Sequence, residues 1–127
     1  MARRKIYIKA GLIEAVAELD DTHTAECIWQ ALPIKGTVQT WGDEVYFAIP
    51  LTLAQENARG VVEAGELGYW PPGKAFCIFF GPTPATRGNE IRPASPVNVF
   101  GRVTSDTTIF RKVKAGTEII VERNNNG

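Results

Sequence analysis

The sequence predicts a single β-rich domain, a barrel or a sandwich, with two short helices. Strand-like segments recur at short spacing, glycine and proline turn signals separate them, and strands do not alternate with long helices. The chain has 127 residues, of which 44% are hydrophobic, enough for one packed core but not for a second lobe. We therefore expect one domain over residues 1–127, with a polar, disordered tail over about residues 124–127.

The first part of the chain predicts a hairpin followed by a helix. Two strand-like segments, 5–10 and 12–19, meet at Gly11, and the first alternates apolar with polar residues. The period then changes to that of an amphipathic helix, which begins at Thr24 and ends before Pro33. Its apolar stripe consists of Ala25, Ile28, Trp29 and Leu32. We expect this face of the helix to pack on the sheet.

A second hairpin is predicted next. Gly42-Asp43 is a two-residue turn signal between the strand-like segments 37–41 and 44–49. Alternation gives the second strand two faces, one with Val45, Phe47 and Ile49 and the other with Glu44, Tyr46 and Ala48. Val61 and Val62 indicate a further short strand.

Proline marks two further segments. Residues 68–73, Gly-Tyr-Trp-Pro-Pro-Gly, are expected to form a rigid aromatic loop and not a central strand, because proline lacks an N–H group and glycine favours turns. Residues 77–80 predict an apolar strand, and a loop over 81–96 with four prolines follows it. Loops of this length are uncommon and often functional.

The last part predicts a strand, a helix and a strand. The first strand covers 97–104 and contains Gly101, which indicates a bulge. The helix covers 105–114 and begins with the capping residues Ser105 and Asp106. A closing strand follows over 118–122.

Composition argues against several classes of function. Because 14 Lys and Arg balance 14 Asp and Glu, no basic surface is expected for nucleic acid. The longest apolar run, 75–80, is far too short to span a membrane, and Lys9 and Glu14 interrupt any secretory signal. We therefore expect a cytoplasmic protein in which Cys27 and Cys77 are free thiols.

The inventory of catalytic side chains is small. Two cysteines and one histidine cannot complete a zinc site from soft ligands alone, so we expect no metal and no cofactor. His23 and Cys27 are spaced to touch on the predicted helix, but no third group or oxyanion site accompanies them. Ser95 and Ser105 do not lie in a Gly-x-Ser-x-Gly motif, so serine hydrolysis is not favoured.

Several motifs resemble a known family, and they run in family order across nearly the whole chain. They are Thr24-Ala25-Glu26 with Ala31-Leu32-Pro33, Trp41 to Phe47, Gly68 to Gly73, Ile78 to Pro84, and Ile91 to Val99. The family is a group of small bacterial and archaeal cyclophilin-like proteins with no settled activity. The resemblance implies a closed barrel of about eight strands with a helix at each end.

Prolyl isomerases of the cyclophilin class are a more distant comparison. The segment 45–50 stands where they carry Phe-His-Arg-Ile-Ile-Pro, whose arginine polarises the proline nitrogen, and Phe47 occupies the arginine's place. A register shift of one residue would place Tyr46 or Ala48 there, and neither is a cation. Of the arginines elsewhere, Arg92 is the best replacement, unless it simply pairs with a nearby carboxylate.

We therefore expect a barrel that binds a peptide or small ligand in a groove, without isomerase activity and without nucleic-acid or membrane partners. The candidate groove residues are Trp41, Glu44, Tyr46, Phe47, Tyr69, Trp70, Phe80, Arg92, Ser95 and Asn98. For the aromatic members the competing interpretation is core packing. Two other functions stay open: a weak peptidyl-prolyl isomerase that uses Arg92, and a subunit of a larger amidohydrolase-type assembly, in which related domains occur.

Overall fold

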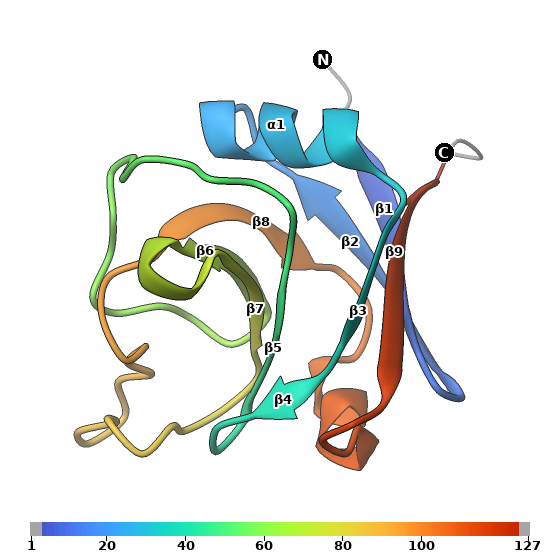
Figure 1. Ribbon diagram of the computed structural model, residues 1–127. Coiled ribbons are helices and arrows are strands. Elements are labelled where there is room, and N and C mark those ends of the chain that lie inside the picture. Colours follow the sequence, from blue (N-terminus) through green and yellow to red (C-terminus); the bar gives the residue numbers. More distant parts are fainter. Residues whose placement is uncertain (1–3, 125–127) are drawn as a thin grey trace.

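A computed structural model describes residues 4–124 and shows one antiparallel sheet of nine strands (Figure 1). The strands are β1 (Lys5–Ala10), β2 (Ile13–Leu19), β3 (Ile34–Thr37), β4 (Gln39–Thr40), β5 (Glu44–Ala48), β6 (Glu66–Trp70), β7 (Ala75–Phe79), β8 (Asn98–Val103) and β9 (Glu118–Asn124). The helices are α1 (His23–Ala31) and two 3-10 helices, η1 (Pro71–Gly73) and η2 (Thr107–Lys112). None of these helices is long and apolar enough to cross a membrane.

The predicted closed barrel is not confirmed. The strand order is β3-β9-β1-β2-β8-β6-β7-β5-β4, and within residues 4–124 no ladder joins the two outermost strands. β3 pairs with β9 and β4 pairs with β5, so Val38 alone carries the chain from one edge of the sheet to the other. The edge strand β3 also approaches β5 at Gly36, where an added Cβ atom would lie 2.6 Å from Cδ2 of Phe47. The sheet thus curves around one core but is open.

The opening hairpin and the first helix are confirmed. β1 and β2 pair from Lys5 opposite Glu18 onward, and Gly11 between them has φ of 60°, in the left-handed region that glycine favours. α1 begins one residue before the predicted start, because the Thr22 side chain accepts a hydrogen bond from the Ala25 N–H at 3.1 Å.

The prediction of a loop over 68–73 is wrong for its first half. β6 lies in the middle of the sheet between β8 and β7, and Tyr69 is fully buried. The two prolines come directly after the strand, in η1, where a missing N–H group costs nothing. Gly68 fits the strand because an added Cβ atom would lie 2.7 Å from Cγ2 of Val97, so the glycine makes room for this side chain.

The remaining predictions differ in smaller ways. β3 was not predicted, since its four residues mix polar and apolar side chains. The irregularity expected near Gly101 is present as a register shift between β6 and β8. The second helix is of the 3-10 type, with Asp106 as its cap. Asn124, the first residue of the predicted tail, ends β9, and residues 125–127 lie outside the described part.

The sheet has two faces, which we call the inner face and the outer face. The inner face carries the main core, in which Phe47 stacks on Phe76 with ring centroids 5.1 Å apart and Phe76 meets Phe100 at 5.0 Å. The outer face carries a smaller buried cluster of Val62, Ala75, Cys77, Phe79 and Val97. β7 is buried along its whole length, because it contributes to both.

Candidate functional site

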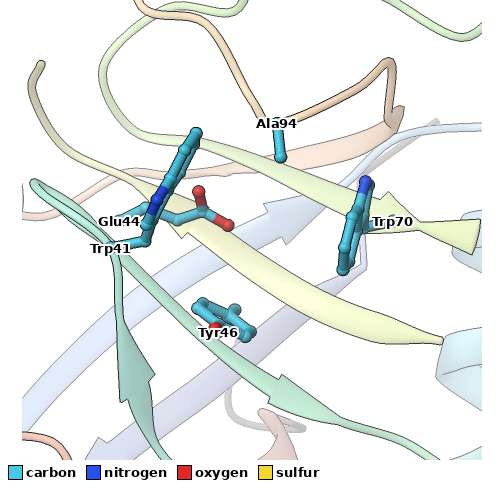
Figure 2. Close-up of a pocket in the computed structure, with 5 residues that line it drawn as sticks. All are labelled: Trp41, Glu44, Tyr46, Trp70 and Ala94. Atoms are coloured by element: carbon cyan, nitrogen blue, oxygen red, sulfur yellow. The ribbon is translucent and has the colours of Figure 1, made fainter. Parts of the chain in front are cut away.

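A pocket of about 210 Å³ opens on the outer face (Figure 2). Trp41 lies in the turn before β5, Glu44 and Tyr46 lie on β5, and Trp70 ends β6. Ala94, from the long proline-containing loop, completes the lining. Three aromatic side chains and one carboxyl group thus surround the same space.

The turn that carries Trp41 is held against the loop after β7. Gly42 has φ of 61°, and an added Cβ atom there would lie 2.9 Å from the carbonyl oxygen of Pro82. The Asp43 N–H donates to this same oxygen at 2.8 Å, and the Trp41 N–H donates to the Glu44 carbonyl at 3.0 Å. Close backbone packing therefore fixes the first wall of the pocket.

The opposite wall, Trp70, is fixed from two sides. Its Nε1–H donates to Oγ of Ser95 at 2.6 Å. Its six-membered ring lies against Gly73, where an added Cβ atom would be 2.6 Å from Cε3 of Trp70. Because Ser95 follows Ala94, this hydrogen bond also ties the loop to the pocket.

Glu44 and Tyr46 project from the same face of β5, as the alternation predicted. Tyr46 lies opposite Cys77 in the ladder with β7 and donates its phenolic hydrogen bond to Gln39 at 3.0 Å. Glu44 is only 6% exposed. Burial raises the pKa of its carboxyl group to about 7, although a hydrogen bond with Cys77 opposes the shift. Burial and then the Glu44 charge raise the pKa of the Cys77 thiol well above its usual value.

Four of the ten predicted groove residues lie elsewhere, on the inner side of the sheet. Phe47, Tyr69, Phe80 and Asn98 are all buried, and the three aromatic ones belong to the main core. Phe47 points inward because it alternates with Tyr46 along β5, so it packs on Phe76 and is not displayed at the surface.

Arg92 does not line the pocket. Its Nη2 donates to a carboxylate oxygen of Glu90 at 2.7 Å, which is the pairing that the sequence left open as its alternative role. Its Nε atom is buried and has no hydrogen-bond partner. The hydroxyl group of Thr83 donates to its backbone carbonyl and holds the loop in place.

Asn98 has a structural role, because it belongs to a buried polar network. Asn98 accepts a hydrogen bond from the Glu56 N–H at 2.9 Å and donates one to the Ala54 carbonyl at 2.9 Å. The Glu56 carboxylate accepts bonds from both the N–H and the hydroxyl group of Thr24, at 2.8 and 2.7 Å. Burial tends to raise the pKa of Glu56, but the bonds from Thr24 and His23 outweigh it and lower the pKa. Nothing local in the sequence signals this contact between distant segments.

The cysteine and histidine pair has the contact that the sequence predicts. Sγ of Cys27 lies 3.4 Å from Nε2 of His23 on an exposed part of α1. Both cysteines are free thiols, as predicted. In residues 4–124, no cluster of three or more His, Cys, Asp or Glu side chains is arranged to hold a metal ion.

Solved structures of other proteins share this fold. The chain is 40% identical to the hypothetical protein AF2241 from Archaeoglobus fulgidus. The match covers 96% of this chain and 95% of that chain and has a TM-score of 0.80. McbB, solved in complex with tryptophan, gives a TM-score of 0.73 at 17% identity, and the match covers 96% of this chain and 45% of that chain.

A search of the curated proteins found no match. The model of the cyclophilin-like family matches residues 4–122, which is nearly the whole chain. The motifs that resembled this family in the sequence lie in α1, β5, β6, β7, β8 and the loops next to them, and they include all the residues that line the pocket. This protein therefore belongs to the cyclophilin-like family.

Proposed function

We propose that this protein binds a small ligand or a peptide side chain in the outer-face pocket, without prolyl isomerase chemistry. The observation that carries the proposal is the lining: Trp41, Tyr46 and Trp70 supply apolar walls, and Glu44 supplies one buried polar group. Aromatic walls with a few placed polar groups are typical of small-molecule sites. The fixed positions of both tryptophans favour binding, because little freedom remains to be lost.

The arrangement around β5 supports the absence of isomerase chemistry. Phe47, which occupies the place of the arginine in prolyl isomerases, is 1% exposed and packs in the core. Of the residues that the structure describes, no lysine or arginine lines the pocket. Without a cation beside the proline nitrogen, the barrier of about 18 to 20 kcal/mol to rotation is not lowered in this way.

The three tryptophans allow a direct test of the binding site. Trp41 and Trp70 line the pocket, whereas Trp29 lies on α1 beneath the guanidinium group of Arg123, at 4.6 Å. Small aromatic compounds, amines and short prolyl peptides should therefore shift the indole N–H signals of Trp41 and Trp70 in nuclear magnetic resonance spectra and leave Trp29 unchanged. Tryptophan belongs in this panel, since McbB was solved in complex with it. If no compound moves either pocket signal at millimolar concentration, the proposal fails.

A pair of tyrosine variants gives the matched control. Tyr46→Ala removes one wall of the pocket, and we expect it to weaken binding of the best compound by about tenfold. Tyr7→Ala removes a half-buried tyrosine from β1, which does not line the pocket, and should leave binding unchanged. Equal losses in the two variants would place the ligand elsewhere.

A weak isomerase that uses Arg92 is the second candidate, favoured by the buried and unpartnered Nε atom of that side chain. A protease-coupled assay on a prolyl peptide separates the two functions. We expect the wild type, Arg92→Ala and the exposed loop control Arg87→Ala to leave the rate at that of the peptide alone. Turnover that disappears in Arg92→Ala but persists in Arg87→Ala would replace our proposal with an isomerase.

A further inference from the structure

The pocket contains a carboxyl group without a cation of its own. Glu44 is 6% exposed, and its carboxyl group projects into the space between the rings of Trp41 and Trp70 (Figure 2). Within residues 4–124, no ion pair joins Glu44 to a lysine or arginine. The pairs formed there use other carboxylates.

Two charged groups near the lining residues in sequence form ion pairs with other side chains. Asp43 lies 3.8 Å from Arg111, and Glu90 pairs with Arg92 at 2.7 Å. The titratable group that contacts Glu44 from β7 is Cys77, whose raised pKa keeps it a neutral thiol. Among residues 4–124, an ionised Glu44 thus has no ion-pair partner.

The aromatic walls, like the Glu44 carboxylate, favour a positively charged ligand. The face of an indole or phenol ring carries partial negative charge and attracts a cation within about 6 Å of its centre. Three such rings next to a carboxylate make a site in which a positive group is stabilised from several sides. A neutral ligand gains apolar contacts from the rings but nothing from the ionised carboxylate.

The size of the pocket limits the ligand to a small group. A volume of about 210 Å³ accommodates a methylated ammonium group with a short chain, and is less than drug-sized ligands usually need. A ligand of this kind can be a free small molecule or the end of a methylated lysine side chain. Both present the same positively charged head.

We infer that the pocket binds an organic ammonium group, with Glu44 as its counter-ion and Trp41, Tyr46 and Trp70 as the surrounding rings. The inference rests on the proposed function, because it names the chemical class of the ligand for that same pocket. Glu44 selects for a positively charged ligand, and the three rings exclude water around the ammonium group.

Two probes of nearly equal shape test the inference on the unmodified protein. Choline carries a quaternary nitrogen, and 3,3-dimethylbutan-1-ol has a neutral carbon in its place. At pH 8, above the pKa of about 7 for Glu44, choline should bind at least about tenfold more tightly and shift the signals of Trp41 and Trp70. Equal or tighter binding of the neutral alcohol would overturn the inference.

A glutamine variant then assigns the selectivity to one residue. Glu44→Gln keeps the size of the side chain and removes its charge, so choline should lose its advantage over the alcohol. Glu63→Gln, on an exposed carboxylate that pairs with Arg102 at 3.6 Å, is the control and should keep that advantage. A Glu44→Gln protein that still prefers choline about tenfold would contradict the role given to Glu44.

The outcomes separate this inference from the proposed function. If both probes shift the pocket signals equally, the pocket binds ligands but does not select cations. If neither probe binds while other compounds in the panel do, the ammonium inference is wrong and the proposed function holds. If nothing binds, both fail. A trimethyllysine peptide compared with its unmethylated form and with choline then shows which source of the ammonium group the pocket prefers.

Discussion

The two faces of β5 show how one short strand can serve stability on one side and a candidate binding site on the other. On the inner face, Phe47 is buried and its ring stacks on that of Phe76. On the outer face, Tyr46 faces a pocket together with Trp41 and Trp70. Two adjacent aromatic side chains of β5 therefore differ in role, one packing in the core and the other lining a pocket, because successive residues of a strand point to opposite faces.

The buried polar groups on the two faces also differ in how fully they are satisfied by hydrogen bonds. On the inner side, the Tyr69 hydroxyl group donates to the Leu51 carbonyl at 2.7 Å and accepts from the Leu53 N–H at 3.1 Å. On the outer side, Glu44 has a raised pKa because its burial is only partly offset. A satisfied polar group fixes the fold, whereas one that remains poorly compensated is available to a ligand.

The largest expected effect comes from placing the isomerase cation where the sequence comparison puts it. Phe47→Arg would bury an unpaired charge in the main core, so we expect it to cost at least about 4 kcal/mol and to prevent stable folding. Tyr46→Arg, one position away on the outer face, should remain folded because its side chain is half-buried and can reach water. Urea unfolding followed by circular dichroism measures both. Similar stabilities for the two variants would contradict the assignment of the faces.

A smaller effect is expected from the pH dependence of stability. Between pH 4.5, the usual pKa of a glutamate, and about 7, folded Glu44 keeps a proton that the unfolded chain releases. The wild type should therefore lose stability as pH rises through this range, by about 2 to 3 kcal/mol from this group. Glu44→Gln should not show this loss, so its advantage over the wild type should grow with pH.

Glu56→Gln is the matched control for this pH experiment. The pKa of Glu56 is lowered, so its ionised form stabilises the fold above pH 4.5 and that contribution is lost as the pH falls. Glu56→Gln should thus be less stable than the wild type at neutral pH, opposite in sign to Glu44→Gln. Thermal unfolding from pH 4 to pH 8 gives both curves. A difference between Glu44→Gln and the wild type that does not change with pH would rule out the raised pKa.

Local patterns were sufficient to predict much of the fold, and four of the five residues that line the pocket were among the predicted groove residues. The two-residue turn at Gly42 and the alternation over β5 placed Glu44 and Tyr46 on the face opposite Phe47, and the structure has them there. These features depend on neighbours in sequence, so a short window of residues contains the information. Trp41 and Trp70, which were also among the predicted groove residues, line the same pocket as these two.

The predictions that failed concern residues whose structure depends on contacts with distant segments of the chain. The run from Gly68 to Gly73 reads as a loop by composition, but β7 and β8 pair with its first half and make it a central strand. Asn98 was selected for the groove, yet it bonds to Glu56 and Ala54, which lie about 40 residues earlier in the chain. Propensity is a weak guide where partners from distant segments supply the hydrogen bonds.

The smallest expected effect distinguishes the hydrogen bonds on the two faces. Tyr69→Phe leaves the half-buried Leu51 carbonyl and Leu53 N–H without their partner and should cost about 1 to 3 kcal/mol of stability. Ser95→Ala removes only the acceptor of the Trp70 indole and should cost about 1 kcal/mol or less. We expect Ser95→Ala to weaken ligand binding more than Tyr69→Phe does. Ser95 orients Trp70, a wall of the pocket, whereas the Tyr69 side chain lies on the inner face of the sheet. If Ser95→Ala destabilised the fold more than Tyr69→Phe and left binding unchanged, the outer face would be a structural element like the inner one.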